Sequence, residues 1–250
     1  MKLLLDIGNT RIKWAYTSED HLLHVGEIVH RGHDTERIAE FVEQLPATPT
    51  GVFAANVAGT RLGSAVSQAI DRRFGVPVRF AVTKLESGSV RNGYEDIAQL
   101  GVDRWAAIVG AYTHFGSAVC IVDAGTAVTV DLVRDGGRHL GGLIVPGLQL
   151  MRSSLEQDTE DIERFSKKSS KPAAGAGFPG RNTASAVRQG TMAALVALID
   201  SCVVALKTTS GTEAELVLTG GDATDLLAAL NRPAIHKPLL VLEGLKQLSG

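Results

Sequence analysis

The stretch Leu3-Leu4-Leu5-Asp6-Ile7-Gly8-Asn9-Thr10 decides the fold, because Val119-Cys120-Ile121-Val122-Asp123-Ala124-Gly125-Thr126 repeats its plan near the middle of the 250-residue chain. Each copy is an apolar strand that ends in Asp-x-Gly, followed by a threonine and a second strand with alternating apolar residues. The repeat predicts duplication of one α/β unit, with a cleft between the copies. We expect half-domains at residues 1–115 and 116–250.

Strand and helix patterns alternate after each copy. Apolar spacing predicts helices at 35–45 and 62–74, and strands at 52–56 and 78–82. After the second copy, a helix is expected from Asn182 to about Leu206, then a strand at 216–218 and helices at 222–230 and 239–248. Residues 157–180 are polar and rich in glycine, which favours a mobile loop.

Composition excludes several classes of protein. The net charge of −2 lacks the basic excess that nucleic-acid binding requires. Cys120 and Cys202 lie in separate apolar stretches, so we expect buried thiols rather than a disulfide or a zinc site. We expect no secretion, because the apolar run before Asp6 is shorter than that of a signal peptide and no small-residue cleavage site follows it. The apolar stretch 192–206 is too short to span a bilayer and contains Asp200, so a buried helix in a cytoplasmic protein without membrane contact is expected.

The segment from Asp6 to Thr10 carries the groups that nucleotide phosphates need. Glycine allows close approach of backbone N–H groups, hydroxyls donate further hydrogen bonds, and Asp6 can hold magnesium directly or through water. Lys13 is placed to add a positive charge on the same face of the next strand. An ordinary hairpin turn is the alternative, but the second copy at 123–126 favours two phosphate-binding turns. Two aspartates near one cleft also imply a bound cation.

Two further segments are candidates for ligand contacts. Gly220-Gly221-Asp222, between a strand and a helix, lets an adenine ring lie against the backbone. Such glycine turns are also common between strands and helices without any ligand. Asp103 lies near the start of an apolar helix, beside Arg104. It is either a helix cap or the base that takes the proton from an acceptor hydroxyl, and the residues alone leave both open. Arg104 suits a carboxylate or phosphate.

Other clusters have simpler interpretations. His21, His24, His30 and His33 lie in an alternating, strand-like segment without a metal-ligand motif. The lysines at 167, 168 and 171 are expected on a solvated loop. The glycines of 141–147 are expected in a strand and turn that line the cleft.

The motifs together resemble the type III pantothenate kinases, a family of the acetate-kinase, sugar-kinase and actin superfamily. The resemblance spans nearly the whole chain and implies duplicated ribonuclease-H-like (actin-like ATPase) half-domains that flank a nucleotide cleft. It is carried, in order, by Asp6–Thr10 with Lys13, Asn92–Tyr94, Gly101–Arg104, Asp123–Thr126, Gly142–Gly147, Asn182–Thr183 and Gly220–Asp222.

The resemblance implies transfer of the γ-phosphate of ATP to pantothenate, the first step of coenzyme A synthesis. It implies that Asp103 is the base and that Asp123 binds potassium or ammonium. The ATP phosphates would contact Asp6, Ile7, Gly8, Asn9, Thr10, Arg11, Ile12, Lys13 and Thr126. Pantothenate would contact Tyr94, Gly101, Val102, Asp103, Arg104 and, across the interface of a homodimer formed through 192–206, Thr183.

One departure and three alternatives accompany the resemblance. The family often has proline after the tyrosine, where this chain has Glu95-Asp96-Ile97. A non-catalytic regulator of the same fold is the main alternative, since the family includes transcription accessory factors. A kinase for another hydroxylated molecule and an actin-like polymerising ATPase are the others.

Overall fold

A computed structural model describes the chain except for residues 19–20, 31–34 and 158–177. The chain divides into two compact units. The first contains Met1–Ser117, Asp135–Gly141 and Leu239–Gly250, and the second contains Ala118–Arg134 and Gly142–Pro238. The C-terminal segment and a short excursion at 135–141 therefore pack with the N-terminal part of the chain. The expected mobile loop lies almost wholly outside the described residues.

The first unit is built on a five-stranded sheet in the order β3-β2-β1-β4-β5. Strand β1 pairs antiparallel with β2 and parallel with β4. Its residues Leu3, Leu4 and Leu5 are all fully buried, as expected for a strand covered on both faces. The strands are β1 Lys2–Ile7, β2 Arg11–Ser18, β3 His21–Val29, β4 Gly51–Asn56 and β5 Val78–Phe80.

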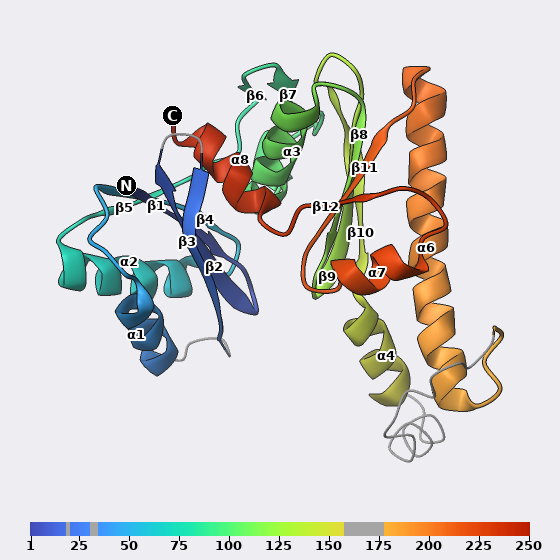
Figure 1. Ribbon diagram of the computed structural model, residues 1–250, viewed down its shortest axis with the longest axis horizontal. Helices are drawn as coiled ribbons and strands as arrows, with labels where there is room; N and C mark the ends of the chain where they lie inside the picture. The colour runs from blue at the N-terminus through green and yellow to red at the C-terminus, as the bar shows by residue number, and fades with distance from the viewer. Residues whose placement is uncertain (19–20, 31–34, 158–177) are drawn as a thin grey trace. The chain divides into compact units, whose positions relative to one another are not determined.

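Helices cover both faces of this first sheet (Figure 1). Helices α1 (Thr35–Gln44) and α2 (Thr60–Phe74) pack against the face that carries Leu3, Leu5 and Ile7. Helices α3 (Val102–Phe115) and α8 (Leu240–Leu248) pack together and contact β1 and β4. The remaining elements of the unit are β6 Glu86–Ser87, β7 Val90–Arg91 and the 3-10 helix η1 Ile97–Gln99.

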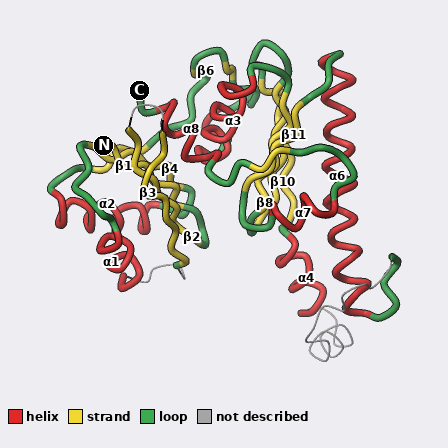
Figure 2. The backbone as a smooth tube through the Cα atoms, viewed as in Figure 1, coloured by secondary structure: helices red, strands yellow, loops and turns green. Residues whose placement is uncertain are grey.

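The second unit repeats the first sheet strand for strand. Its order is β10-β9-β8-β11-β12, with β8 antiparallel to β9 and parallel to β11. Thus β8 corresponds to β1, and β11 corresponds to β4 (Figure 2). The shared order confirms the predicted duplication of an α/β unit. The strands are β8 Val119–Ala124, β9 Ala127–Val133, β10 His139–Pro146, β11 Glu215–Thr219 and β12 Ile235–His236.

The helices of the second unit are α4 (Leu148–Gln157), α6 (Thr183–Ser210) and α7 (Ala223–Ala229). Helices α6 and α7 cover the sheet face that carries Cys120, Val122 and Ala124. Asn182 begins α6 with a capping box, in which its side chain accepts from Ser185 N at 2.9 Å and Ser185 Oγ accepts from the Asn182 N–H. The predicted cap is confirmed, whereas α4 was not predicted.

Helix α6 corrects the expectation of a buried helix at 192–206. The helix is 28 residues long, and only one side packs on the core. The other side is exposed, with Val204 at 58%. Among the described residues, α6 is the one helix long and apolar enough to cross a membrane by length and composition. Core helices of soluble proteins pass the same test, so the absence of membrane contact stays a prediction.

Candidate active site

The turn between β1 and β2 is the first candidate phosphate site. Strand pairing ends at Ile7 and Ile12, and the Gly8 N–H closes the turn by donating to the Arg11 carbonyl at 3.1 Å. Asn9 and Thr10 are exposed at its tip. The side chains of Ile7 and Ile12 lie in the core, so these two residues can offer only backbone atoms to a ligand.

Charged side chains form a row across this sheet. Asp6, Lys13 and Glu27 are direct partners on β1, β2 and β3, and such partners project from the same face. Arg11 lies two residues before Lys13, and its guanidinium is 3.0 Å from Glu27. Lys13 therefore places a positive charge beside the half-buried Asp6. The same charge offsets that of Asp6, which weakens the charge argument for a metal there.

The second candidate site forms where β8 and β11 end. Gly125 N–H donates to the Ala127 carbonyl at 3.1 Å, and Gly147 N–H donates to the Thr126 carbonyl at 2.9 Å. Asp123 is the parallel partner of Thr219, the residue before Gly220. The second unit thus brings Asp123 and the Gly125-Thr126 turn to the same end of the sheet as the glycines after β11.

Gly220 needs to be glycine for two independent reasons. Its φ of +93° is a conformation that side chains rarely adopt. A Cβ here would also lie 2.4 Å from the Ala124 carbonyl oxygen and 2.5 Å from Asp123 Oδ1. The backbone can therefore approach the Asp123 carboxylate closely, which explains the glycine better than the need for a turn between strand and helix alone.

Asp103 is in the first turn of α3 but is not its N-cap. The N-cap is Gly101, which has no side chain to donate or accept. Asp103 Oδ1 accepts the N–H of Arg104 at 2.7 Å, which satisfies one unpaired donor of the first turn. A carboxylate in this place is also favoured by the positive end of the helix dipole. Asp103 is therefore not the helix cap that the sequence offered as one interpretation. Its carboxylate, if ionised, can still accept a proton.

Arg104, Tyr94 and His139 form a compact polar cluster. Arg104 is 7% exposed, and its Nη1 donates to Tyr94 Oη at 2.8 Å. The ring of His139 stacks on the ring of Tyr94, with centroids 5.8 Å apart and planes inclined by 13°. His139 is fully buried. Tyr94 is thus held between Arg104 at its hydroxyl and His139 at its ring face.

Sequence reasoning missed His139 because its partners are far away in the chain. It comes from the 135–141 excursion, which packs with the first unit although its neighbours belong to the second. A Cβ on Gly93 would lie 1.9 Å from the His139 carbonyl oxygen, so only glycine fits there. Asn92 completes the loop by accepting the Tyr94 N–H at 2.9 Å. These contacts explain the Asn92-Gly93-Tyr94 motif.

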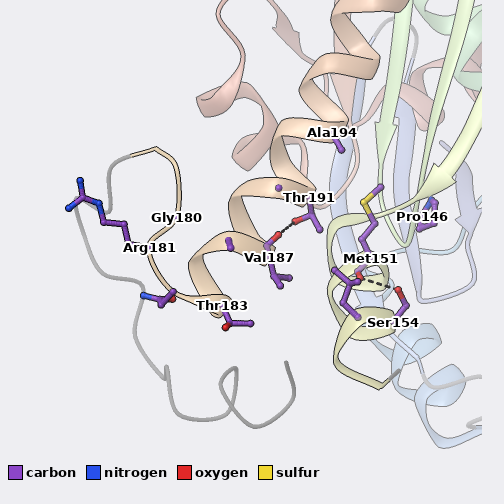
Figure 3. Close-up of a pocket in the computed structure, with 13 residues that line it drawn as sticks. Pro146, Met151, Ser154, Gly180, Arg181, Thr183, Val187, Thr191 and Ala194 are labelled. Atoms are coloured by element: carbon purple, nitrogen blue, oxygen red, sulfur yellow. Dashed lines mark hydrogen bonds between the residues drawn. The ribbon is translucent and has the colours of Figure 1, made fainter. Parts of the chain in front are cut away.

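Thr183 lies on an open groove in the second unit. The groove has a volume of about 920 Å³ and runs between α4 and the first half of α6. Figure 3 shows Thr183 and Val187 on one wall, with Met151 and Pro146 on the other. Thr191 also lines it, and its hydroxyl donates to the Val187 carbonyl at 2.9 Å. The groove is mainly apolar, with Thr183 as a polar group at its end.

The remaining sequence candidates are the histidine cluster, the loop lysines and the two cysteines. No group of three potential metal ligands occurs within the described residues, and His33 lies outside them, as do the lysines at 167, 168 and 171. Both cysteines are buried, as predicted. Burial raises the pKa of the Cys120 thiol strongly and raises that of Cys202, so both thiols stay protonated and unreactive at neutral pH.

The predicted residues therefore gather within the units in a definite way. The first unit holds Asp6 to Lys13, Tyr94 and Gly101 to Arg104. The second unit holds Asp123, Thr126, Thr183, Gly220 and Gly221. The first group contains candidates for phosphate and acceptor contacts, and the second contains the repeated turn and its glycines.

Comparison with known sequences gives a consistent family assignment. The model of the family described as type III pantothenate kinase matches residues 2–205. A type III pantothenate kinase from Halorhodospira halophila is 35% identical over 254 residues, which cover 98% of this chain and 96% of that protein.

Solved structures agree on the fold. A conserved protein from Campylobacter jejuni, assigned to the Baf family of transcriptional activators, has a TM-score of 0.62 at 20% identity and covers 98% of this chain and 96% of its own. An activator of 2-hydroxyisocaproyl-CoA dehydratase from Clostridium difficile, with bound ADPNP, has a TM-score of 0.53 at 13% identity, with coverage of 99% and 94%. With the repeated strand order, these likenesses confirm the actin-like fold.

Proposed function

The chain belongs to the type III pantothenate kinase family, and from this premise we propose that it transfers the γ-phosphate of ATP to the primary hydroxyl of pantothenate. The product is 4′-phosphopantothenate, in the first step of coenzyme A synthesis, and we place the enzyme in the cytoplasm. The observation that carries the proposal is the position of the Asp103 carboxylate. It lies in the first turn of α3, two residues after the N-cap Gly101 and next to Arg104.

Asp103 is the base in this proposal. As the acceptor oxygen forms its bond to the γ-phosphorus, its proton passes to the Asp103 carboxylate and ADP leaves with the bridging oxygen. The N–H of Arg104, which donates to Asp103 Oδ1 at 2.7 Å, holds one carboxylate oxygen in place. In the proposal, this hydrogen bond orients the carboxylate for the acceptor hydroxyl. Positioning of this group matters more than its basicity in phosphoryl transfer.

The two repeated turns are the proposed phosphate sites. The segments from Asp6 to Lys13 and at Thr126 would contact the ATP phosphates through backbone N–H groups, hydroxyls and the Lys13 ammonium. Gly220 and Gly221 would leave room for the adenine ring against the backbone. The close approach of Gly220 to Ala124 and Asp123 shows that the backbone at the end of β11 is tightly packed there.

Oxygen ligands in both units fit cations. Magnesium in kinases is held by one or two carboxylates together with substrate phosphates, and the described residues offer single carboxylates rather than a preformed cluster. Asp6 would hold magnesium, directly or through water, and Asp123 would hold potassium or ammonium. When bound, these cations neutralise charge on the phosphates during transfer.

The cluster around Tyr94 is the proposed pantothenate site. Arg104 presents a planar guanidinium to the pantothenate carboxylate, and Tyr94 lies beside it with its ring supported by His139. The backbone of Gly101 and Val102 at the start of α3 would add contacts. This arrangement supports recognition of a small acceptor that carries both a carboxylate and a hydroxyl.

The phenylalanine variant of Tyr94 is expected to weaken pantothenate binding. Tyr94→Phe removes the hydroxyl that accepts from Arg104, so the KM for pantothenate rises about three- to tenfold while kcat and the KM for ATP stay near wild type. Steady-state kinetics with each substrate varied would measure this. Tyr112→Phe, which removes a hydroxyl elsewhere in the first unit, is the control. An unchanged KM for pantothenate would argue against this contact.

A homodimer formed through α6 is part of the proposal. Small or short side chains follow one another along its exposed side at spacings of three and four, a pattern that lets a second helix approach closely. They are Ala186, Gly190, Ala193, Ala197, Ser201, Val204 and Thr208. This side continues into the groove at Thr183, so a second copy bound along α6 would cover both. Thr183 would then reach the pantothenate site of the partner subunit.

Introducing a charge on this side of α6 is expected to abolish the dimer. Ala197→Glu should give a monomer by sedimentation, because a carboxylate cannot be buried unpaired between helices. Ser64→Glu, on the exposed side of α2, is the matched control and should leave the dimer intact. A wild-type protein that is fully active as a monomer at micromolar concentration would contradict this part of the proposal.

Mixing two inactive variants tests whether Thr183 acts across the interface. Asp103→Asn and Thr183→Ala chains, after exchange of subunits, form heterodimers with one intact site. About a quarter of the wild-type activity should then return, because half of the dimers regain one of two sites. If subunit exchange is proven and no activity returns, Thr183 does not complete the active site that contains Asp103 of the other subunit.

The proposed activity is tested by assay of the purified protein with ATP, magnesium and pantothenate. Formation of 4′-phosphopantothenate, faster with potassium or ammonium than with sodium, is the expected result. Other small hydroxy acids serve as competing acceptors. ATP binding without transfer to any of these acceptors would favour the regulator alternative. That alternative has no specific support here, because the likeness to the Baf family structure at 20% identity concerns the fold alone.

A further inference from the structure

His30, directly after β3, is anchored to the first phosphate turn. Its side chain is 3% exposed, and its Nε2 lies 2.8 Å from the carbonyl oxygen of Gly8. A carbonyl oxygen can only accept, so Nε2 carries the hydrogen and donates it. The backbone N–H of the same residue donates to the Thr10 carbonyl at 3.0 Å. One residue therefore holds two carbonyl groups of the turn.

The direction of the Gly8 carbonyl determines the direction of the next N–H group. Among the described residues the one cis peptide bond is Phe178-Pro179, so the bond between Gly8 and Asn9 is trans. In a trans peptide the carbonyl and the following N–H point in opposite directions. Since the Gly8 carbonyl is turned toward His30, the Asn9 N–H is turned away from it, at the exposed tip of the turn.

Glycine makes this anchor necessary. Gly8 has more backbone freedom than any other residue type, so the peptide after it can rotate at little cost in energy. Within the turn, the Gly8 N–H donates to the Arg11 carbonyl, and this hydrogen bond does not involve the Gly8 carbonyl. The imidazole of His30 supplies that missing constraint.

The other edge of the ring indicates that His30 is more than a space-filling core residue. Its Nδ1 is buried and has no hydrogen-bond partner within the described part of the chain. An unpaired buried nitrogen is unfavourable, and an apolar side chain of similar size would avoid it. What histidine offers and an apolar residue does not is the bond from Nε2 to Gly8.

We propose that His30 is a positioning residue for nucleotide binding, which holds the Gly8–Asn9 peptide so that the Asn9 N–H is presented to a phosphate oxygen of ATP. The inference rests on the proposed function, because it takes this turn to be a phosphate site. It also separates His30 from the other histidines of its segment, such as His21, which is exposed on β3.

Two variants of similar length separate the hydrogen bond from the volume of the side chain. His30→Gln places an amide N–H near the position of Nε2, whereas His30→Met fills the space without a donor. Calorimetry with ATP and purified protein should show a Kd about tenfold higher for His30→Met, and within about twofold of wild type for His30→Gln. The KM for pantothenate should not change in either variant. His21→Ala is the control and should bind ATP as wild type does.

Each outcome decides the question. Equal ATP affinity of His30→Met and wild type would overturn the inference, as would equally weak binding by His30→Gln and His30→Met. If His30→Met does not fold, His30→Asn replaces it, because its shorter amide reaches only the Nδ1 position and should bind as weakly as predicted for methionine. A wild-type protein that binds pantothenate but no ATP would overturn the proposed function as well, whereas normal wild-type binding with unaffected variants would overturn this inference alone.

Discussion

Asp103→Asn is expected to lower kcat by about 10²–10⁴-fold while the Kd for ATP stays close to the wild-type value. Asparagine is nearly isosteric and can still accept the Arg104 N–H through its side-chain oxygen, so the start of α3 is preserved. It cannot take up the proton of the acceptor hydroxyl. The loss should therefore appear in the chemical step, measured by single-turnover transfer of labelled phosphate.

Asp96→Asn is the matched control for this variant. Asp96 is the N-cap of η1, and its Oδ1 accepts the Ala98 N–H at 3.0 Å in the loop that leads to α3. Asparagine is as good a cap as aspartate, so both stability and kcat should be retained. If Asp103→Asn kept its kcat and instead lowered the free energy of unfolding, Asp103 would be a structural residue and the proposed mechanism would lose its base.

Gly220→Ala is expected to lower the free energy of unfolding by about 2–4 kcal/mol and to remove ATP binding. The new methyl group meets a positive φ and two oxygen atoms, the Ala124 carbonyl and Asp123 Oδ1. The Ala124 carbonyl belongs to the end of β8 and is held in the sheet. The backbone after β11 must therefore move away from it, and the Asp123 carboxylate is displaced as well. Urea unfolding and calorimetry with ATP would measure the two effects.

Gly211→Ala separates backbone strain from collision. Gly211 ends α6 with a φ of +73°, but nothing lies within 4 Å of a Cβ built there. Only the left-handed conformation is penalised, at about 1 kcal/mol, and ATP binding should be unaffected. Equal effects of the two substitutions would mean that the close approach at Gly220 is unimportant, and would remove the argument for a ligand surface there.

Local patterns predicted much of the fold. The apolar run of β1, the alternation in β2, the spacing in α2 before Gly75 and the cap at Asn182 were all visible, because each depends on residues a few positions apart. The repeated plan of an apolar strand that ends in Asp-x-Gly, followed by a threonine, predicted the second sheet in the same way. The stretch 192–206 was expected both to be buried and to form a dimer interface, but the sequence did not tell which side of α6 is exposed, since small apolar residues look alike whether they face a core or another surface.

The sequence by itself determined the duplicated α/β architecture and the positions of the two turns, because these follow from short-range periodicity and turn chemistry. The family came from the resemblance of the ordered motifs, and the comparisons show it. Only the tertiary structure decided that Gly101 rather than Asp103 caps α3, that His139 supports Tyr94, and that His30 holds the Gly8 carbonyl. The last two of these contacts join residues 45 and 22 positions apart in the chain. No local pattern encodes such pairs, because they arise when separately formed elements pack and bury their polar groups against one another.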